Sequence, residues 1–137
     1  PHNRSQIEFS SLDELVEQDN QVRFIDAFVE KLDLNQLNFV TKTLKNEGRP
    51  SFNPKVLLKL YFYGYLNGIG SSRRLEKECK RNIELHWLMQ KLIPNYHTIA
   101  DFRKDNPLAL KNTFKLFVLF LKDMGLVAGH TVAIDGT

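Results

Sequence analysis

The fold depends on one stretch, residues 53–70, which reads NPKVLLKLYFYGYLNGIG. Asn53 can accept a hydrogen bond as a helix N-cap, and Pro54 suits the first helical position because its missing N–H would have no partner there. The residues that follow are apolar on most sides of a helix, to about Leu66, and two glycines then end it. The stretch therefore predicts one helix at the centre of a hydrophobic core.

Helical patterns continue on both sides of this stretch. Residues 11–37 place apolar side chains at helical spacing, with Asp19 or Asn20 as a cap, and a loop follows at 46–54. Downstream we expect a helix from a cap at Ser71 or Ser72 to about Lys80, one over 83–92, one over 99–104 capped by Thr98, and the longest over 108–124 with Gly125 just past its end. The longest helix should bury Leu110, Phe114, Phe117, Leu121 and Met124, widened by Leu116 and Phe120.

The last residues change character. Residues 131–137 read TVAIDGT, in which β-branched residues precede Asp-Gly, so a strand running into a turn is expected there. Such a strand needs partners in a sheet beyond Thr137. Asp135, at the end of this strand, is placed either to hold a divalent metal or simply to form a turn.

Composition bounds the class of protein. The 137 residues are 42% hydrophobic and 26% charged, which is typical of a soluble globular domain. One cysteine, Cys79, excludes an internal disulfide framework and fits a reducing compartment, so we expect a cytoplasmic protein. The longest apolar stretch, 108–127, is interrupted by lysines, which argues against a membrane span.

Charge is distributed unevenly along the chain. The net charge is +3, but residues 1–48 carry five Lys/Arg against nine Asp/Glu, whereas residues 49–137 carry fourteen against seven. An acidic head before a basic body indicates a polyanionic partner for the body. Ordinary solvated charge is the alternative, and composition alone favours neither.

The most informative pattern follows Ser71. At about 100° per residue, five cations share an arc of about 120°, while Leu75 and Cys79 point to the opposite side. A helix that docks by one side and presents cations on the other suits a phosphate backbone, although pairing with Glu76 and Glu78 on a solvated face would explain it too. The five cations are Arg73, Arg74, Lys77, Lys80 and Arg81.

The order of the helices resembles an expanded helix-turn-helix arrangement. In such folds one helix enters the major groove by its N-terminal residues. We expect the helix that begins at His97-Thr98 to be this reader, with Ile99 and Phe102 facing inward; the alternative is an ordinary packing helix. Its outward side chains are His97, Thr98, Asp101, Arg103 and Lys104, of which the aspartate fits a DNA surface least well.

Other chemistry is not indicated. The four histidines and Cys79 have no metal-ligand spacing, so no zinc site is expected, and Cys79 should be buried and inert. The glycines form neither a dinucleotide-binding nor a phosphate-loop fingerprint. The aromatic run at 61–65 lies between apolar residues, which favours core packing over base stacking.

Several motifs in order resemble a known family. SLDEL lies at 11–15, GRPSFNP at 48–54, LLKL at 57–60, YGYLNG at 63–68, SSRRLE at 71–76, RNIE at 81–84, HTIADFR at 97–103 and VAIDGT at 132–137. Together they resemble the N-terminal part of DDE insertion-sequence transposases of the InsH-type group. The resemblance covers nearly the whole chain.

The resemblance implies a mainly α, multi-helical DNA-binding domain over 1–128, divided into an acidic head (1–47) and a basic helix-turn-helix-like body (48–128). Residues 129–137 would begin a truncated RNase H-like catalytic domain. Asp135 matches the first acid of the Asp-Asp-Glu set, and three such acids would hold two Mg²⁺ ions in the parent protein. We expect the chain to be a non-catalytic fragment that needs no cofactor by itself.

The implied role is to bind the terminal inverted repeats of a mobile element as a homodimer, without a membrane or small-molecule partner. Two alternatives belong to other classes. One is a DNA-binding regulator with no catalytic parentage. The other is a helical protein-interaction module that assembles through the acidic head and uses its cations only for solubility.

Overall fold

The computed structural model describes residues 11–40 and 52–125. In these residues every regular element is a helix, so the mainly α prediction is confirmed for this part. The predicted strand at 131–137, with Asp135, and most of the predicted loop at 46–54 lie outside the described residues.

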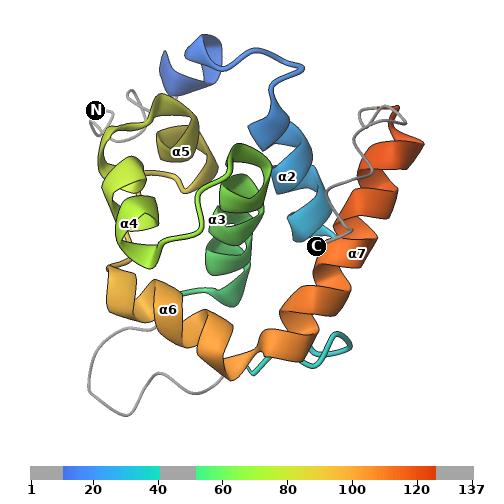
Figure 1. Cartoon of the computed structure of the whole chain (residues 1–137). Coiled ribbons are helices and arrows are strands. Elements are labelled where there is room, and N and C mark those ends of the chain that lie inside the picture. Colours follow the sequence, from blue (N-terminus) through green and yellow to red (C-terminus); the bar gives the residue numbers. More distant parts are fainter. Residues whose placement is uncertain (1–10, 41–51, 126–137) are drawn as a thin grey trace, which may run out of the picture.

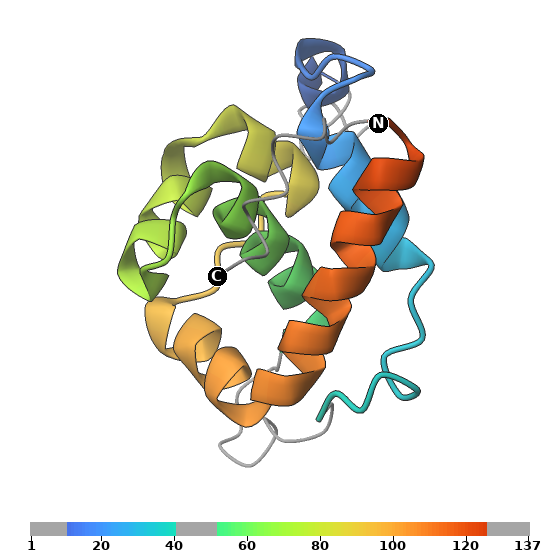
Figure 2. The same cartoon turned by 45° about the vertical axis from the view of Figure 1, so that its right-hand side comes forward.

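One helix stands in the middle of the others (Figure 1). It is α3 (Pro54–Asn67). The helices α2 (Gln21–Glu30) and α7 (Pro107–Asp123) lie to one side of it, and α4 (Ser72–Arg81) and α5 (Ile83–Leu88) to the other, while α6 (Tyr96–Asp105) closes one end; Figure 2 shows the same arrangement after rotation. A further short helical segment covers residues 11–15.

The central helix begins and ends as predicted. The Asn53 side chain accepts a hydrogen bond from the Lys55 N–H at 2.8 Å, Pro54 occupies the first turn, and Gly68 ends the helix with φ 70°. Eight consecutive residues, 57–64, are buried. A helix buried on all sides must be the centre of the core, because each side needs a neighbour.

Gly64 lets the chain fold back tightly after α3. A Cβ atom on this residue would lie 2.6 Å from the carbonyl oxygen of Ile69 and 3.1 Å from a methyl group of Leu75. The turn from α3 into α4 therefore depends on a missing side chain, and this turn places α4 against the core.

An aromatic cluster joins α2, α3 and α7. The Phe62 ring stacks on Phe117 with 4.3 Å between centroids and meets Phe114 edge-on at 4.9 Å. Phe28 from α2 contacts both Phe62 and Phe117, at 5.7 and 5.2 Å. Such pairs add about 0.5–1.5 kcal/mol each to the free energy of burial.

A buried lysine ties α2 to α3. The Lys59 ammonium lies 2.7 Å from Asp26 Oδ1 and 2.7 Å from Glu30 Oε2, and Lys59 is only 5% exposed. Burial disfavours the charged ammonium, but the hydrogen bonds and charges of the two carboxylates outweigh it and raise the pKa of Lys59. The bond from Lys59 likewise lowers the pKa of Glu30.

A polar network ties α2 and α3 to the junction of α4 and α5. Glu84 accepts hydrogen bonds from the Asn20 side chain and from the Tyr63 hydroxyl, each at 2.7 Å. Asn82, which ends α4 and caps α5, donates to the Tyr63 oxygen at 3.0 Å. Burial and the Glu84 charge raise the pKa of Tyr63, so the hydroxyl stays a donor at physiological pH.

The residues before α2 dock against α5. The Trp87 indole N–H donates to the Asp13 carboxylate at 3.0 Å, and this bond is the main cause of a lowered pKa for Asp13. The Arg23 guanidinium lies 4.8 Å from the Trp87 ring centroid and donates to the carbonyl oxygens of Asp13 and Val16. The start of the acidic head is therefore held on the side of α5.

Two helix boundaries differ from the prediction. The helix predicted over 83–92 ends at Leu88, because Gln90 and Lys91 adopt φ of 52° and 65°, in the left-handed region that a helix cannot use. The helix predicted to follow a Thr98 cap begins three residues earlier. Its cap is Asn95, whose side-chain oxygen accepts from the Thr98 N–H at 2.9 Å.

The stripe predicted on α7 is partly wrong. Leu110, Phe117 and Leu121 are buried as expected, and Phe114 and Phe120 pack at the edge of the core. Leu116 and Met124, however, are 41% and 50% exposed. Leu116 faces away from the buried side of the helix, and Met124 comes after its last helical residue.

Candidate nucleic-acid interface

The α4 helix docks by one side and presents its cations on the other, as predicted. Leu75 and Cys79 are buried, whereas all five predicted cations are exposed. Ser71 starts the helix, its hydroxyl accepting from the Arg74 N–H at 3.2 Å. Burial raises the pKa of the Cys79 thiol to about 12, which keeps it protonated and unreactive at neutral pH.

The two glutamates of α4 compensate only part of its charge. Glu78 pairs with Arg81 at 2.6 Å, and hydrogen bonds from Arg81 and Asn82 lower the pKa of Glu78. Glu76 pairs with Lys80 at 3.4 Å. Within the described residues, Arg74 and Lys77 form no ion pair, and both side chains are exposed to solvent.

The first turn of α6 packs on α4 through one tyrosine. The Tyr96 N–H donates to Glu76 Oε1 at 2.9 Å. The Arg73 guanidinium lies 3.9 Å from the centroid of the Tyr96 ring and donates to its hydroxyl at 2.9 Å. The His97 ring follows at 4.1 Å between centroids. Arg73 and His97, 24 positions apart in the sequence, therefore share one place on the surface.

The other predicted residues of α6 lie at its far end. Ile99 and Phe102 are buried as predicted. Arg103 and Lys104 are exposed in the last turn, about 10 Å along the helix from Tyr96. The Arg103 guanidinium lies 5.1 Å from the centroid of the buried Tyr61 ring. The predicted residues thus form two groups, one where α4 meets α6 and a smaller one at the end of α6.

Sequence reasoning placed Tyr96 outside the helix and gave it no role. The signal that would have included it is Asn95, a good N-cap directly after Pro94. Thr98 is only half-exposed, because it lies in the first turn instead of capping it. The exposed acid Asp101 lies on the same helix.

Other kinds of site have little support in the part of the chain that the structure describes. Among these residues no group of three or more histidine, cysteine or acidic side chains could hold a metal ion, and no helix is long and apolar enough to cross a membrane. Asp135, the predicted metal ligand, lies outside this part.

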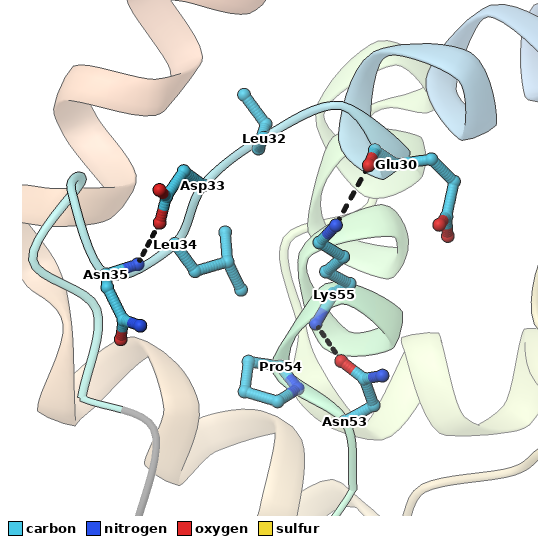
Figure 3. Close-up of a pocket in the computed structure, with 8 residues that line it drawn as sticks. All are labelled: Glu30, Leu32, Asp33, Leu34, Asn35, Asn53, Pro54 and Lys55. Carbon is cyan, nitrogen blue, oxygen red and sulfur yellow. Dashed lines mark hydrogen bonds between the residues drawn. The ribbon is translucent and has the colours of Figure 1, made fainter.

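An open pocket lies between the end of α2 and the start of α3 (Figure 3). Its polar groups bond to one another: the Lys55 ammonium donates to the Glu30 carbonyl oxygen at 2.9 Å, and Asp33 accepts from the Asn35 N–H at 3.1 Å. Asn53 is engaged as the cap of α3. The pocket therefore offers a ligand few unsatisfied partners.

A family model described as a transposase domain (DUF772) matches residues 10–105. The chain belongs to this family. Neither a curated protein nor a solved structure matches the chain. The matched range of this transposase domain contains α2 to α6, and hence the whole cationic face of α4 and its contact with Tyr96, whereas α7 lies outside the match.

Proposed function

We propose that this transposase domain binds duplex DNA through the face shared by α4 and α6. In the parent protein the DNA would be the terminal inverted repeats of a mobile element. The observation that carries the proposal is the exposed cationic side of α4, joined to the first turn of α6 inside a transposase family. We call the two groups together the α4–α6 surface; it consists of Arg73, Arg74, Lys77, Lys80, Arg81, His97 and Thr98 and, at the end of α6, of Arg103 and Lys104.

The members of this surface suit different parts of a duplex. Arg74 and Lys77, exposed and without an ion pair in the described residues, suit phosphates, because neutralising a phosphate releases counterions and requires only charge. The first turn of α6, with His97 and Thr98, suits base edges, as N-terminal residues of recognition helices do. The start of the acidic head is held beside α5 by the hydrogen bond between Asp13 and Trp87, whereas the end of its described part packs on α6, where Phe39 stacks on Phe102.

Fluorescence anisotropy with a labelled duplex tests the proposal, at salt concentrations between about 50 and 200 mM. We expect binding that weakens steeply with salt. Replacing Arg73, Arg74 and Lys77 by alanine should weaken it more than tenfold and reduce the salt slope by about 2–3, since each lost phosphate contact contributes about 0.9.

A matched control removes three exposed lysines elsewhere. Replacing Lys111, Lys115 and Lys122 of α7 by alanine changes the net charge equally but leaves the α4–α6 surface intact. An equal loss of DNA affinity in both triple variants would show that DNA is attracted by the overall charge of the protein, and that the α4–α6 surface is wrongly assigned. Absence of binding by the unaltered chain at the lowest salt would contradict DNA binding and favour an assembly module.

For the parent protein we propose that Asp135 is the first of three acids that hold Mg²⁺, and that two copies pair the two ends of the element. The support is the resemblance of VAIDGT (132–137) to the first catalytic strand of DDE transposases. Mg²⁺ would supply Lewis-acid activation of the attacking oxygen. Strand cleavage by the full-length protein should be lost on Asp135→Asn while end binding is kept. Sedimentation with and without an end duplex would count the copies.

A further inference from the structure

We propose that Arg73 reads a guanine in the major groove and that Tyr96 is the positioning residue that orients its guanidinium. This inference rests on the proposed binding of duplex DNA and goes further, since it assigns sequence discrimination to one side chain. It also gives a role to Tyr96, which is not a contact residue of the α4–α6 surface.

The Arg73 guanidinium is held from two sides. It lies over the Tyr96 ring at 3.9 Å, and one of its amino groups donates to the Tyr96 hydroxyl at 2.9 Å. The tyrosine is itself anchored, because its N–H donates to Glu76 and its backbone begins α6. Glu76 belongs to α4, so the same two helices that carry the arginine also fix its platform.

A guanidinium held in this way retains most of its donors. It has five N–H groups in a planar fork, and the tyrosine hydroxyl takes one. The rest can donate in parallel to two acceptors, as O6 and N7 of guanine require. A lysine ammonium can also reach O6 and N7, but it has no planar fork that the Tyr96 ring could hold in one orientation.

The neighbouring Arg74 shows what the platform adds. Both arginines are exposed and lie in the first turn of α4, but no aromatic ring of the described residues lies beneath Arg74. A phosphate accepts from many directions and needs only a charge within reach. The two acceptors of guanine, O6 and N7, have a fixed geometry, so the orientation of the guanidinium plane matters for this contact. Orienting the guanidinium before binding reduces the side-chain entropy that is lost on binding.

Selection from a pool of duplexes with a randomised central segment tests the proposal, using the unaltered chain and the variants Arg73→Lys, Tyr96→Phe and Arg74→Lys. Affinities are then measured for the enriched duplex and for duplexes in which each G·C pair is replaced by A·T. The unaltered chain should prefer guanine at one position by about 5- to 150-fold, the range of a bidentate contact.

The variants should separate recognition of the guanine base from electrostatic attraction to the DNA backbone. Arg73→Lys should reduce the guanine preference, because the oriented fork is lost, but keep the salt slope, because the charge remains. Tyr96→Phe should reduce the preference several-fold, since the ring stays and only the hydrogen bond is lost. Arg74→Lys is the matched control and should keep the preference.

Two results overturn the inference and differ from failure of the proposed function. A guanine preference that is undiminished in Arg73→Lys, or a chain that binds duplexes without any guanine preference, shows that Arg73 does not read the base. Absence of binding to the whole pool at low salt instead contradicts DNA binding itself, and this inference with it. Circular dichroism of each variant confirms that the helices are intact.

Discussion

Lys59 on α3 and Lys77 on α4 show how differently two regions of the molecule use the same side chain. Lys59 is buried, with its ammonium 2.7 Å from two carboxylates. Lys77 is exposed and has no ion pair in the described residues. The charge of Lys59 is neutralised inside the protein and cannot attract a partner. The charge of Lys77 is exposed and can interact with a binding partner. The side of α2, α3 and α7 therefore stabilises the fold, and the side of α4 and α6 is the one that we propose binds DNA.

The largest effect should follow from Phe62→Ala, at the centre of the aromatic cluster. Loss of a fully buried phenylalanine and the cavity it leaves should cost about 3–5 kcal/mol of unfolding free energy. Thermal unfolding followed by circular dichroism should show the melting temperature falling by about 10–20 °C.

The control for Phe62→Ala is Leu119→Ala on the exposed side of α7, which should change stability little. DNA affinity of the Phe62 variant, measured well below its melting temperature, should stay near that of the unaltered chain. A specific loss of affinity in the folded variant would break the division between the two regions.

A smaller effect is expected for Lys59→Met, which leaves Asp26 and Glu30 without their cation. The variant should be less stable by about 1–2 kcal/mol at neutral pH, below the usual cost of breaking a buried pair because both carboxylates reach solvent. Urea unfolding of both proteins would measure the difference.

The pH dependence of that difference sharpens the test. The folded pKa of Glu30 is lowered, so its contribution is present above the ordinary value of 4.5 and is lost as the pH falls below it. The folded pKa of Lys59 is raised, so its contribution is present below the ordinary value of 10.5 and is lost as the pH rises through the raised value. The stability difference should therefore shrink at both extremes. A difference that does not vary with pH would mean that packing of the lysine stem, and not its charge, joins α2 to α3.

The smallest effect on stability should come from Arg74→Ala. Stability should change by less than about 0.5 kcal/mol, because the side chain is exposed and unpaired within the described residues. Its salt slope for DNA binding should nevertheless decrease by about 0.9. An unchanged slope together with unchanged stability would remove Arg74 from the α4–α6 surface.

Local chemistry accounts for what could be predicted from the sequence. Asn53, Pro54 and Gly68 act within a few residues of themselves, so the bounds of α3 followed from them. The exposed arc of α4 followed from helical spacing, because one docked side leaves only one face for its cations. The family prediction is confirmed as far as a transposase domain, while its assignment to the InsH-type group stays a prediction.

What could not be predicted depends on contacts between distant residues. Asn95 and Thr98 are both good caps, and only the packed structure shows that the first starts α6. Tyr96 meets Arg73 because Gly64 and the turn after α3 bring α4 across the start of α6. The early end of α5 depends on left-handed residues, Gln90 and Lys91, which are neither glycine nor asparagine.

The contact between Trp87 and the acidic head makes the protein its own optical probe. Trp87 is the single tryptophan of the chain, and its indole contacts Asp13, which precedes α2, and Arg23, which lies on α2. The fluorescence emission of Trp87 therefore reports loss of the contact with the Asp13 segment, and no attached dye is needed. Titrating DNA while following this signal would show whether binding at α4 and α6 changes the contact between Trp87 and Asp13.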